Sequence, residues 1–459
     1  MQREKSIFII ILWLLCSVPA MAQSRVLTPD SCRQLALDSN KELKVADMQR
    51  VSAYYTRKSA FTNYLPKVSA SGMYMHTGKE LSLLSDEQKT TLANIGTALS
   101  MPQLNAVGSG LVDALRTDTR NMTGATLMLT QPIYMGGKIR AYNKIAHMAE
   151  NIADSRYDMK RQELIVSVDE TYWNIVALSA KKRLAESYLD LVSTLDSDVE
   201  QMISEGVATK ADGLSIKVKV NEAKVALIQI DNGIEIMKMH LCQLCGLDAH
   251  ADITLADEDA DTFASCAPDD NTDITAWQQR PELRALSTSS MIHDEKVKIA
   301  RAQFLPSVVL TGGYLVSNPS VFNSFEKKFK GTWNIGVAVN IPILTWGDRS
   351  YKVKAAKAEA LASRFEYEET REKVELQVNQ SRQKVEEAHQ RLAASLSSQA
   401  EAEENLRYAT IGMKEGVIPV SNVLEAQTAW LAARSGLITS EIDLRLAYIY
   451  LKKSTGTIK

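Results

Sequence analysis

A long uninterrupted stretch decides the fold of this chain: from Lys138 to Glu205 it reads KIRAYNKIAHMAENIADSRYDMKRQELIVSVDETYWNIVALSAKKRLAESYLDLVSTLDSDVEQMISE, with no glycine and no proline. As one continuous helix it would reach about 100 Å, far beyond the average helix of a globular protein. Apolar residues such as Ile165, Val168 and Tyr172 recur at steps of three and four, as helix-on-helix packing requires. The stretch therefore predicts a rod-like α-helix.

The chain is predicted to double back after each of two such helices. The long stretches end at Gly206 and Gly416, and the helical stretches that follow run to Gly246 and Gly456. Glycine is the usual residue just beyond a helix end, so each pair is predicted to form an antiparallel helical hairpin. The narrow apolar stripes fit coiled-coil seams better than a thick core.

The sequence is written twice. Residues 40–43 (NKEL) recur at 280–283 (RPEL), 240 positions later, whereas 205–207 (EGV) recur at 415–417 (EGV), only 210 positions later. The difference indicates an insertion of 30 residues in the first copy, within the Gly-, Ser-, Thr- and Asn-rich region 76–124. A duplication of this length favours an assembly built by repetition over a compact enzyme.

The N-terminus predicts export. Basic residues precede an apolar run that ends at Leu15, and small residues up to Ala22 complete a secretory signal cleaved before Gln23. A membrane anchor is one alternative, but the run is too short for a hydrocarbon core of ~30 Å. Lipidation at Cys16 is another, disfavoured by the bulky Leu15 in front of it. The predicted organisation is a signal peptide at 1–22, a first repeat at 23–250 with an enlarged loop at 76–124 and a tip near 206, a linker at 251–275, and a second repeat at 276–459 with a tip near 416.

Composition and motifs argue against several classes of function. The formal net charge of -2 gives no reason to expect nucleic-acid binding. The chain has no G-x-S-x-G or H-E-x-x-H motif, and its 6 histidines lack metal-ligand spacing, so we expect no enzyme, cofactor or metal centre. Cys242 and Cys245 form a C-x-x-C without the second pair of a structural zinc site, so burial as small apolar side chains explains them better than a redox or metal role. A disulfide among these and Cys32 or Cys266 stays open.

Between the helices the sequence alternates with the period of a strand. Residues 332–343 (TWNIGVAVNIPI) carry Trp333, Ile335, Val337 and Val339 on one face, predicted to face lipid, and mostly small or polar residues on the other. The length is about that of a tilted transmembrane strand. The segments that match it less cleanly are 67–75, 125–133 and 307–316. Four strands cannot close a barrel, so several chains must pool their strands.

The order of these elements resembles the TolC-type outer-membrane efflux family. The resemblance is carried by residues 131–137 (QPIYMGG) and 341–347 (IPILTWG), by the two EGV tips and by the duplication, and it covers essentially all of the mature chain. It implies a mainly α fold with membrane β: a trimeric 12-stranded outer-membrane β-barrel, continued by a long periplasmic α-helical barrel. Each chain would supply four strands and two long helical hairpins.

The resemblance also implies a function and partners. The chain would be the exit duct of a tripartite efflux or type I secretion system, passing substrates to the outside and performing no covalent chemistry. Its expected partners are two further copies of itself, outer-membrane lipid, a periplasmic adaptor and an inner-membrane transporter. An exported coiled-coil scaffold without a pore is the alternative, and the alternating segment 332–343 speaks against it.

Two groups of site residues follow from the resemblance. Adaptor docking is expected at the tips, at Gly206, Val207, Ala208, Gly416, Val417 and Ile418. The periplasmic aperture is expected at Glu425, Asn422 and Asp212, with a ring of Glu425 carboxylates that favours cations and binds polyvalent metal ions. The family's closing latch is not carried over, because Ile418 and Met413 replace its basic and aromatic residues. Closure is expected to rest on apolar packing or on Asp212 with an unidentified partner.

Overall fold

The computed structural model describes residues 25–78, 81, 82, 84–117, 119–260, 276–322 and 326–458. The predicted signal peptide at 1–22, Cys266 and the linker residues 261–275 lie outside this part of the chain. The chain divides into two compact units. We call them the helical unit, made of Met1–Val51, Asn151–Ser287 and Phe365–Lys459, and the sheet unit, made of Ser52–Glu150 and Thr288–Arg364.

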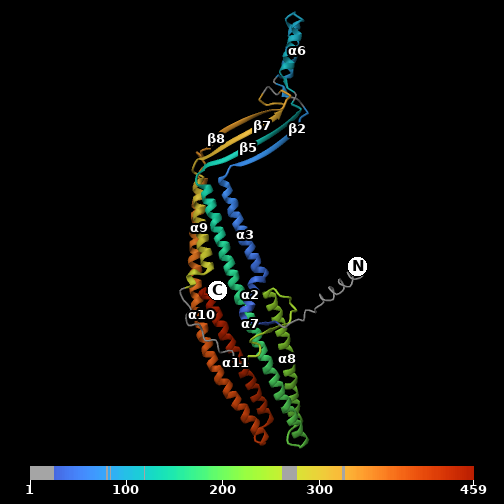
Figure 1. The fold of residues 1–459 in the computed structure, drawn as a ribbon, viewed down its shortest axis with the longest axis vertical. Coiled ribbons are helices and arrows are strands. Elements are labelled where there is room, and N and C mark those ends of the chain that lie inside the picture. The colour runs from blue at the N-terminus through green and yellow to red at the C-terminus, as the bar shows by residue number, and fades with distance from the viewer. Residues whose placement is uncertain are drawn as a thin grey trace, which may run out of the picture. The chain divides into compact units, whose positions relative to one another are not determined.

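Helices make up most of the described chain (Figure 1). The helices are α2 Pro29–Ser39, α3 Lys41–Phe61, η1 Thr62–Tyr64, α4 Asp86–Ala93, α5 Ile95–Ala98, α6 Leu104–Ala114, α7 Lys138–Ser204, α8 Lys210–Cys245, η2 Ala276–Gln279, α9 Pro281–Ala302, α10 Asp348–Lys414 and α11 Val420–Thr455. The strands are β1 Arg25–Leu27, β2 Lys67–His76, β3 Leu81–Ser82, β4 Arg116–Thr117, β5 Asn121–Met135, β6 Ile253–Leu255, β7 Ser307–Asn318 and β8 Lys330–Asn340. In this part of the chain, none of the helices has the length and apolar content needed to cross a bilayer.

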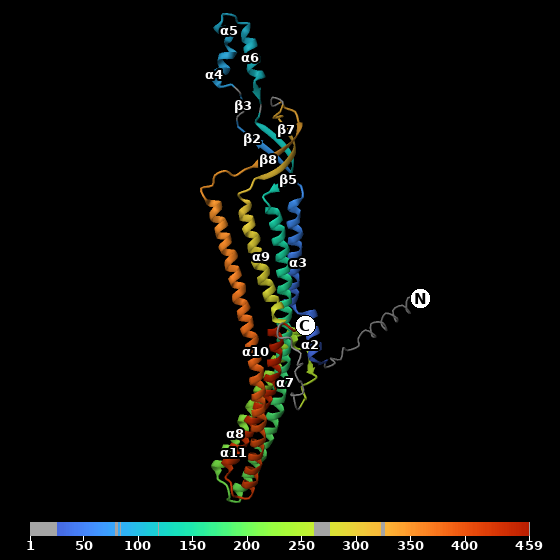
Figure 2. The ribbon, with the colours of Figure 1, turned by 90° about the vertical axis from the view of Figure 1, so that its left-hand side faces the viewer.

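The two long hairpins match in length. Helices α7 and α10 each have 67 residues, and the return helices α8 and α11 each have 36. The predicted long helix from Lys138 and the turns at Gly206 and Gly416 are present, and Gly246 and Gly456 end the return helices in a left-handed conformation. Figure 2 shows α10 and α11 as one of these hairpins.

The core of the helical unit surrounds the first long helix. Tyr172, Ile175 and Val176 of α7 are buried together with residues of α2, α8 and the parallel pair β1–β6. Helix α2 begins with Thr28 as its cap and Pro29 in its first turn, and the Thr28 side chain accepts a hydrogen bond from the Ser31 N–H. The N-terminal helix thus covers α7 inside the same chain.

The sheet unit contains a four-stranded antiparallel sheet in the order β2-β5-β7-β8 (Figure 1). Strand β8 ends at Asn340, so the expectation that Pro342 and Ile343 belong to it is wrong. Proline has no N–H to donate to a neighbouring strand. The register between β5 and β7 shifts between Pro132 and Tyr134 for the same reason. The enlarged loop folds in part, into β3, α4, α5, α6 and β4.

Candidate functional site

Both hairpin tips are built by the same backbone turn. Gly206 and Gly416 have φ angles of +81° and +74°, in the left-handed region that favours glycine. The Val207 N–H donates to the Met202 carbonyl at 2.8 Å, and the Val417 N–H donates to the Gly412 carbonyl at 2.9 Å. This 6→1 bond is the mark of a Schellman motif. An added Cβ at Gly206 or Gly416 would meet no atom within 4 Å, so the conformation, not crowding, requires glycine.

The caps that follow the two turns differ. In the first tip the Thr209 hydroxyl accepts from the Asp212 N–H, and the Asp212 carboxylate accepts from the Thr209 N–H and hydroxyl at 3.0 and 2.6 Å. These bonds, led by the one from the Thr209 side chain, lower the pKa of Asp212. In the second tip Pro419 is the cap residue and makes no such bond. The Asp212 carboxylate is therefore bonded to Thr209 in its own turn, while its expected part in closing the aperture stays a prediction.

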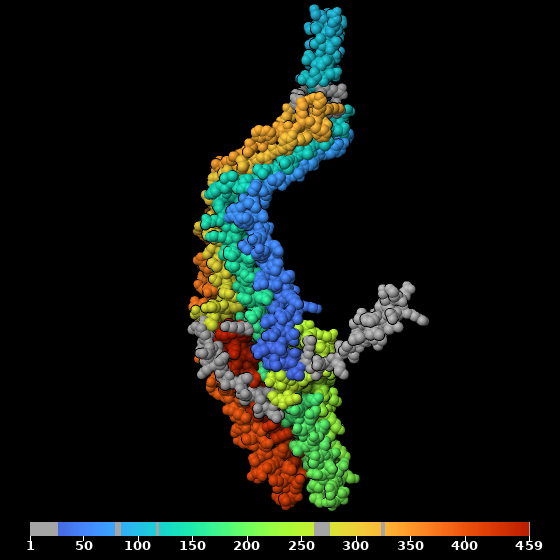
Figure 3. Space-filling model, viewed as in Figure 1, coloured from blue at the N-terminus to red at the C-terminus, as the bar shows by residue number. Residues whose placement is uncertain are grey.

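The two hairpins pack together just above their tips, as the green and orange-red surfaces of Figure 3 show. This tip core consists of Leu195, Val199, Ile216, Ala409, Met413, Val420, Val423 and Ala426. Met413, one of the two latch positions, is buried in it. Ile418, the other, lies over Gly412, where an added Cβ would come within 2.5 Å of the Ile418 side chain. Both positions therefore serve apolar packing within this chain.

The expected aperture residues lie on the first two turns of α11. Asn422 and Glu425 are exposed, on either side of the buried Val423. Within the described residues the Glu425 carboxylate has no hydrogen-bond or ion-pair partner, so its charge is available to solvent and ions. Farther from the tips, α7, α8 and α11 enclose a groove of about 410 Å³ whose lining includes Tyr188, Ala223 and Leu431.

One face of the sheet is apolar across all four strands. Trp333 of β8 lies opposite Tyr314 of β7. Tyr314 lies opposite Leu127 of β5, and Leu127 lies opposite Ala70 of β2. The next row on the same face joins Ile335, Gly312, Leu129 and Val68. On β8 the exposed fraction falls only from 74 % at Trp333 to 56 % at Val339. The four residues predicted to face lipid therefore share a face that the described chain leaves uncovered.

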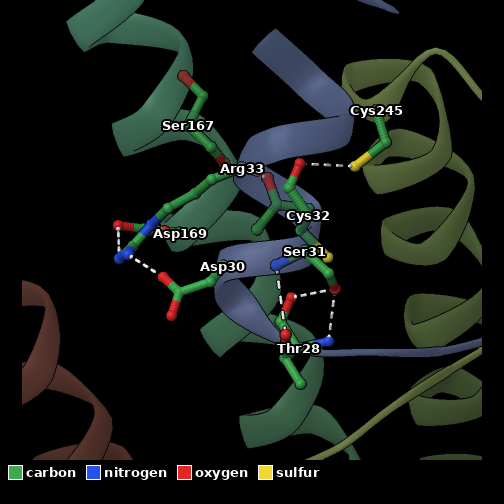
Figure 4. A network of polar contacts seen from close by, with 9 residues as sticks. Thr28, Asp30, Ser31, Cys32, Arg33, Ser167, Asp169 and Cys245 are labelled. Atoms are coloured by element: carbon green, nitrogen blue, oxygen red, sulfur yellow. Dashed lines mark hydrogen bonds and ion pairs between the residues drawn. The ribbon is translucent and has the colours of Figure 1, made fainter. Parts of the chain in front are cut away.

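Sequence reasoning missed an ion pair that fixes α2 on α7 (Figure 4). The Arg33 guanidinium donates to both oxygens of Asp169 at 2.6 and 2.7 Å, and to Asp30 at 2.7 Å. The bonds to Asp169 raise the pKa of Arg33, while burial raises the pKa of Asp169 against the effect of Arg33. No local pattern announces this pair, because its members are far apart in the sequence.

The cysteines of the C-x-x-C are buried, as predicted. Cys242, Cys245 and Cys32 are free thiols, and the Cys245 Sγ lies 3.6 Å from the Cys32 carbonyl oxygen (Figure 4). Burial raises the pKa of Cys242, which favours the unreactive thiol over the thiolate. Across the described ranges, no three His, Cys, Asp or Glu side chains are grouped to hold a metal ion.

Comparison with known proteins gives consistent matches. The family model of the outer membrane efflux protein matches residues 32–247 and 275–457. The outer membrane protein TolC of Vibrio cholerae is 23% identical over 320 residues, which cover 67% of this chain and 70% of the relative. The cation efflux system protein CusC of Escherichia coli is 19% identical over 440 residues, or 92% of this chain and 93% of the relative.

Solved structures share the fold. The CmeC outer membrane channel of Campylobacter jejuni superposes with a TM-score of 0.77 at 18% identity, covering 93% of this chain and 85% of that one. The outer membrane protein VceC of Vibrio cholerae gives a TM-score of 0.75 at 17% identity, covering 93% and 96%. At these identities the agreement concerns the fold.

Proposed function

This chain belongs to the outer membrane efflux protein family, and from this membership and the pattern of its sheet we infer that it is the outer-membrane channel of an efflux system. The single observation that carries the inference is the apolar face shared by β2, β5, β7 and β8. A contiguous apolar surface of this kind needs lipid or a partner to cover it. A pore-free scaffold has no use for it.

The working form is a homotrimer. Strands β2 and β8 each pair with one neighbour among the described strands, so each leaves one edge of backbone donors and acceptors unpaired. In lipid each unpaired group costs several kcal/mol, which closure with neighbouring chains removes. Three chains would supply the strands of a 12-stranded barrel. The export signal at 1–22 and a periplasmic position for the helical unit complete this arrangement.

The hairpin tips would receive a periplasmic adaptor, which joins the channel to an inner-membrane transporter. Both tips present a glycine with open space above it and an exposed valine, Val207 or Val417. Glycine permits close approach of a docking backbone. The half-buried Ala208 and Ile418 would complete the two docking surfaces. The groove above the tip core would accept further contacts.

The aperture would be lined by Glu425, with Asn422 beside it. Three unpaired carboxylates brought together by trimer symmetry would favour cations and bind polyvalent metal ions. The Asp212 carboxylate is held by Thr209 in the cap of its own turn, so Glu425 is the better candidate for this role. The selectivity of the closed mouth would therefore rest on one residue per chain.

Reconstitution separates the channel from the scaffold. Protein extracted from outer membranes should migrate as a heat-modifiable trimer and give stepwise conductance in a planar bilayer. A protein that crosslinks only as monomers or dimers in native membranes and never conducts would refute the proposal.

Conductance measurements in a planar bilayer also test the proposed aperture residues. Glu425→Ala should lose cation preference and block by polyvalent metal ions, whereas Asn422→Ala, its matched control one turn away, should change little. Unchanged selectivity in the Glu425 variant would refute the proposed carboxylate ring, but it would not contradict the proposal that the protein is a channel.

A further inference from the structure

Three methionines gather on one face of strands β2 and β5. Met75 and Met122 lie directly opposite each other in the antiparallel register. Met73 stands two residues before Met75, and side chains two apart on a strand share a face. Directly opposed residues have Cβ atoms about 4.5–5.5 Å apart, within reach of side chains as long as methionine. Three thioether sulfurs can therefore converge above this strand pair.

The register decides which face carries them. The apolar face of the sheet takes the even-numbered residues of β2, including Ala70 in the row of Trp333. Met73 and Met75 are odd-numbered and lie on the opposite face, together with Asn334 of β8. On the apolar side Tyr74 donates to Asn121 at 3.2 Å. The methionines thus line the face that would surround the lumen under the proposed function.

Exposed thioethers are unusual on such a face. Lumen-facing positions of membrane barrels are normally polar. Met73 and Met75 are 57 % and 41 % exposed, so the described chain does not bury them as core residues. The only positive charge in the same cross-sheet row is Lys330, which Glu326 neutralises at 2.7 Å. The result is a sulfur-rich patch on this face, with Arg120 two residues before Met122 as a further nearby charge.

We propose that Met73, Met75 and Met122 form a binding site for a soft monovalent cation, Cu(I) or Ag(I), on the lumen wall near the outer end of the barrel. The location rests on the proposed function, while the grouping rests on the register alone. Thioether sulfur selects soft cations over the hard ions that carboxylates prefer. Neutral ligands also hold a cation loosely enough for it to leave, as a conducting pathway requires. The cation would be cargo in transit.

Silver titration of the purified full-length protein in detergent tests the site. Calorimetry with silver nitrate should reveal a site in the wild-type protein that is lost in the triple variant Met73→Leu, Met75→Leu, Met122→Leu. Leucine keeps the volume and apolar character and removes only the sulfur. Met128→Leu, on the same face of β5 but away from the group, should bind as wild type does. The buried cysteines are common to all three proteins and cancel.

Two results would overturn the inference. The first is equal silver binding by the wild type and the triple variant. The second is a loss of silver binding in Met128→Leu that equals the loss in the triple variant. X-ray absorption at the silver edge should show a smaller contribution from sulfur ligands in the triple variant than in the wild type. Conductance in a planar bilayer distinguishes the two proposals. A wild-type protein that conducts but lacks the silver site would refute only this inference. A wild-type protein that never conducts would refute the proposed channel function.

Discussion

The two long hairpins have the same helix lengths and turns, but their long helices α7 and α10 are buried to different extents. Helices α7 and α10 have the same length, yet α7 is enclosed by α2, α8 and β1–β6 of its own chain. Helix α10 leaves large apolar residues such as Leu376, Leu396 and Tyr408 exposed. Duplication thus preserved length and turn geometry, which set the reach of the hairpins, while their surfaces diverged. The exposed apolar side chains of α10 form a surface of the kind that commonly marks an interaction site.

A matched pair of leucines tests this difference most strongly. Leu195 of α7 is 4 % exposed in the tip core, whereas Leu396 of α10 is 49 % exposed. Leu195→Ala should reduce the free energy of unfolding by about 2–5 kcal/mol, because it removes buried methyl groups and leaves a cavity. Leu396→Ala should change the free energy of unfolding of the monomer by no more than about 0.5 kcal/mol. Unfolding followed by circular dichroism measures both.

The proposed trimer allows a second test of the same difference. A larger cost for Leu396→Ala in the trimer than in the monomer would mean that a neighbouring chain covers α10. Equal costs for the two leucines in the monomer would break the comparison between the hairpins.

The edge strands extend the comparison, since β2 comes from the first repeat and β8 from the second. Val337→Arg should cost about 2–4 kcal/mol near the bilayer midplane, because a charge is placed in hydrocarbon. Val68→Arg, on the same face of β2, should cost a similar amount if both edges join a closed barrel. Asn334→Arg, on the opposite face of β8, is the control and should be tolerated. Folding into lipid vesicles under urea titration measures the differences; equal tolerance on both faces would mean that the alternation is misinterpreted.

The tip glycines come next in size. Alanine at Gly206 or Gly416 should cost about 1–2 kcal/mol, because it must adopt a left-handed conformation. Leucine should cost little more within the chain, since each site opens onto empty space. If an adaptor docks there, the leucine variants should nevertheless lose export while their trimer levels stay intact. Substrate export and trimer abundance should be measured in the same cells. Loss of the trimer would instead favour a purely structural role for the glycines.

Local signals made much of this fold predictable. The Thr28 cap, the tip glycines and the start of α7 at Lys138 all follow from short-range rules of helix ends and periodicity. The pairing of Met75 with Met122 could not be predicted, because register depends on contacts between distant strands. The role of Asp212 had a signal that was overlooked: Thr209 and an acidic residue three positions later form a capping box.

The smallest expected effect concerns that cap, where the two tips differ by one hydrogen-bonded pair. Thr209→Ala should cost about 1 kcal/mol of helix stability at neutral pH, while Pro419→Ala should cost less because Pro419 makes no side-chain cap bond. The pKa of Asp212 is lower in the folded protein, so its contribution is complete above its ordinary pKa of about 3.9 and is lost as the pH falls through the folded value. Acid should therefore loosen the first tip before the second, and Thr209→Ala should abolish that difference. Hydrogen exchange of the two tips at neutral and acid pH measures it, and equal protection of both tips at every pH would contradict the assignment.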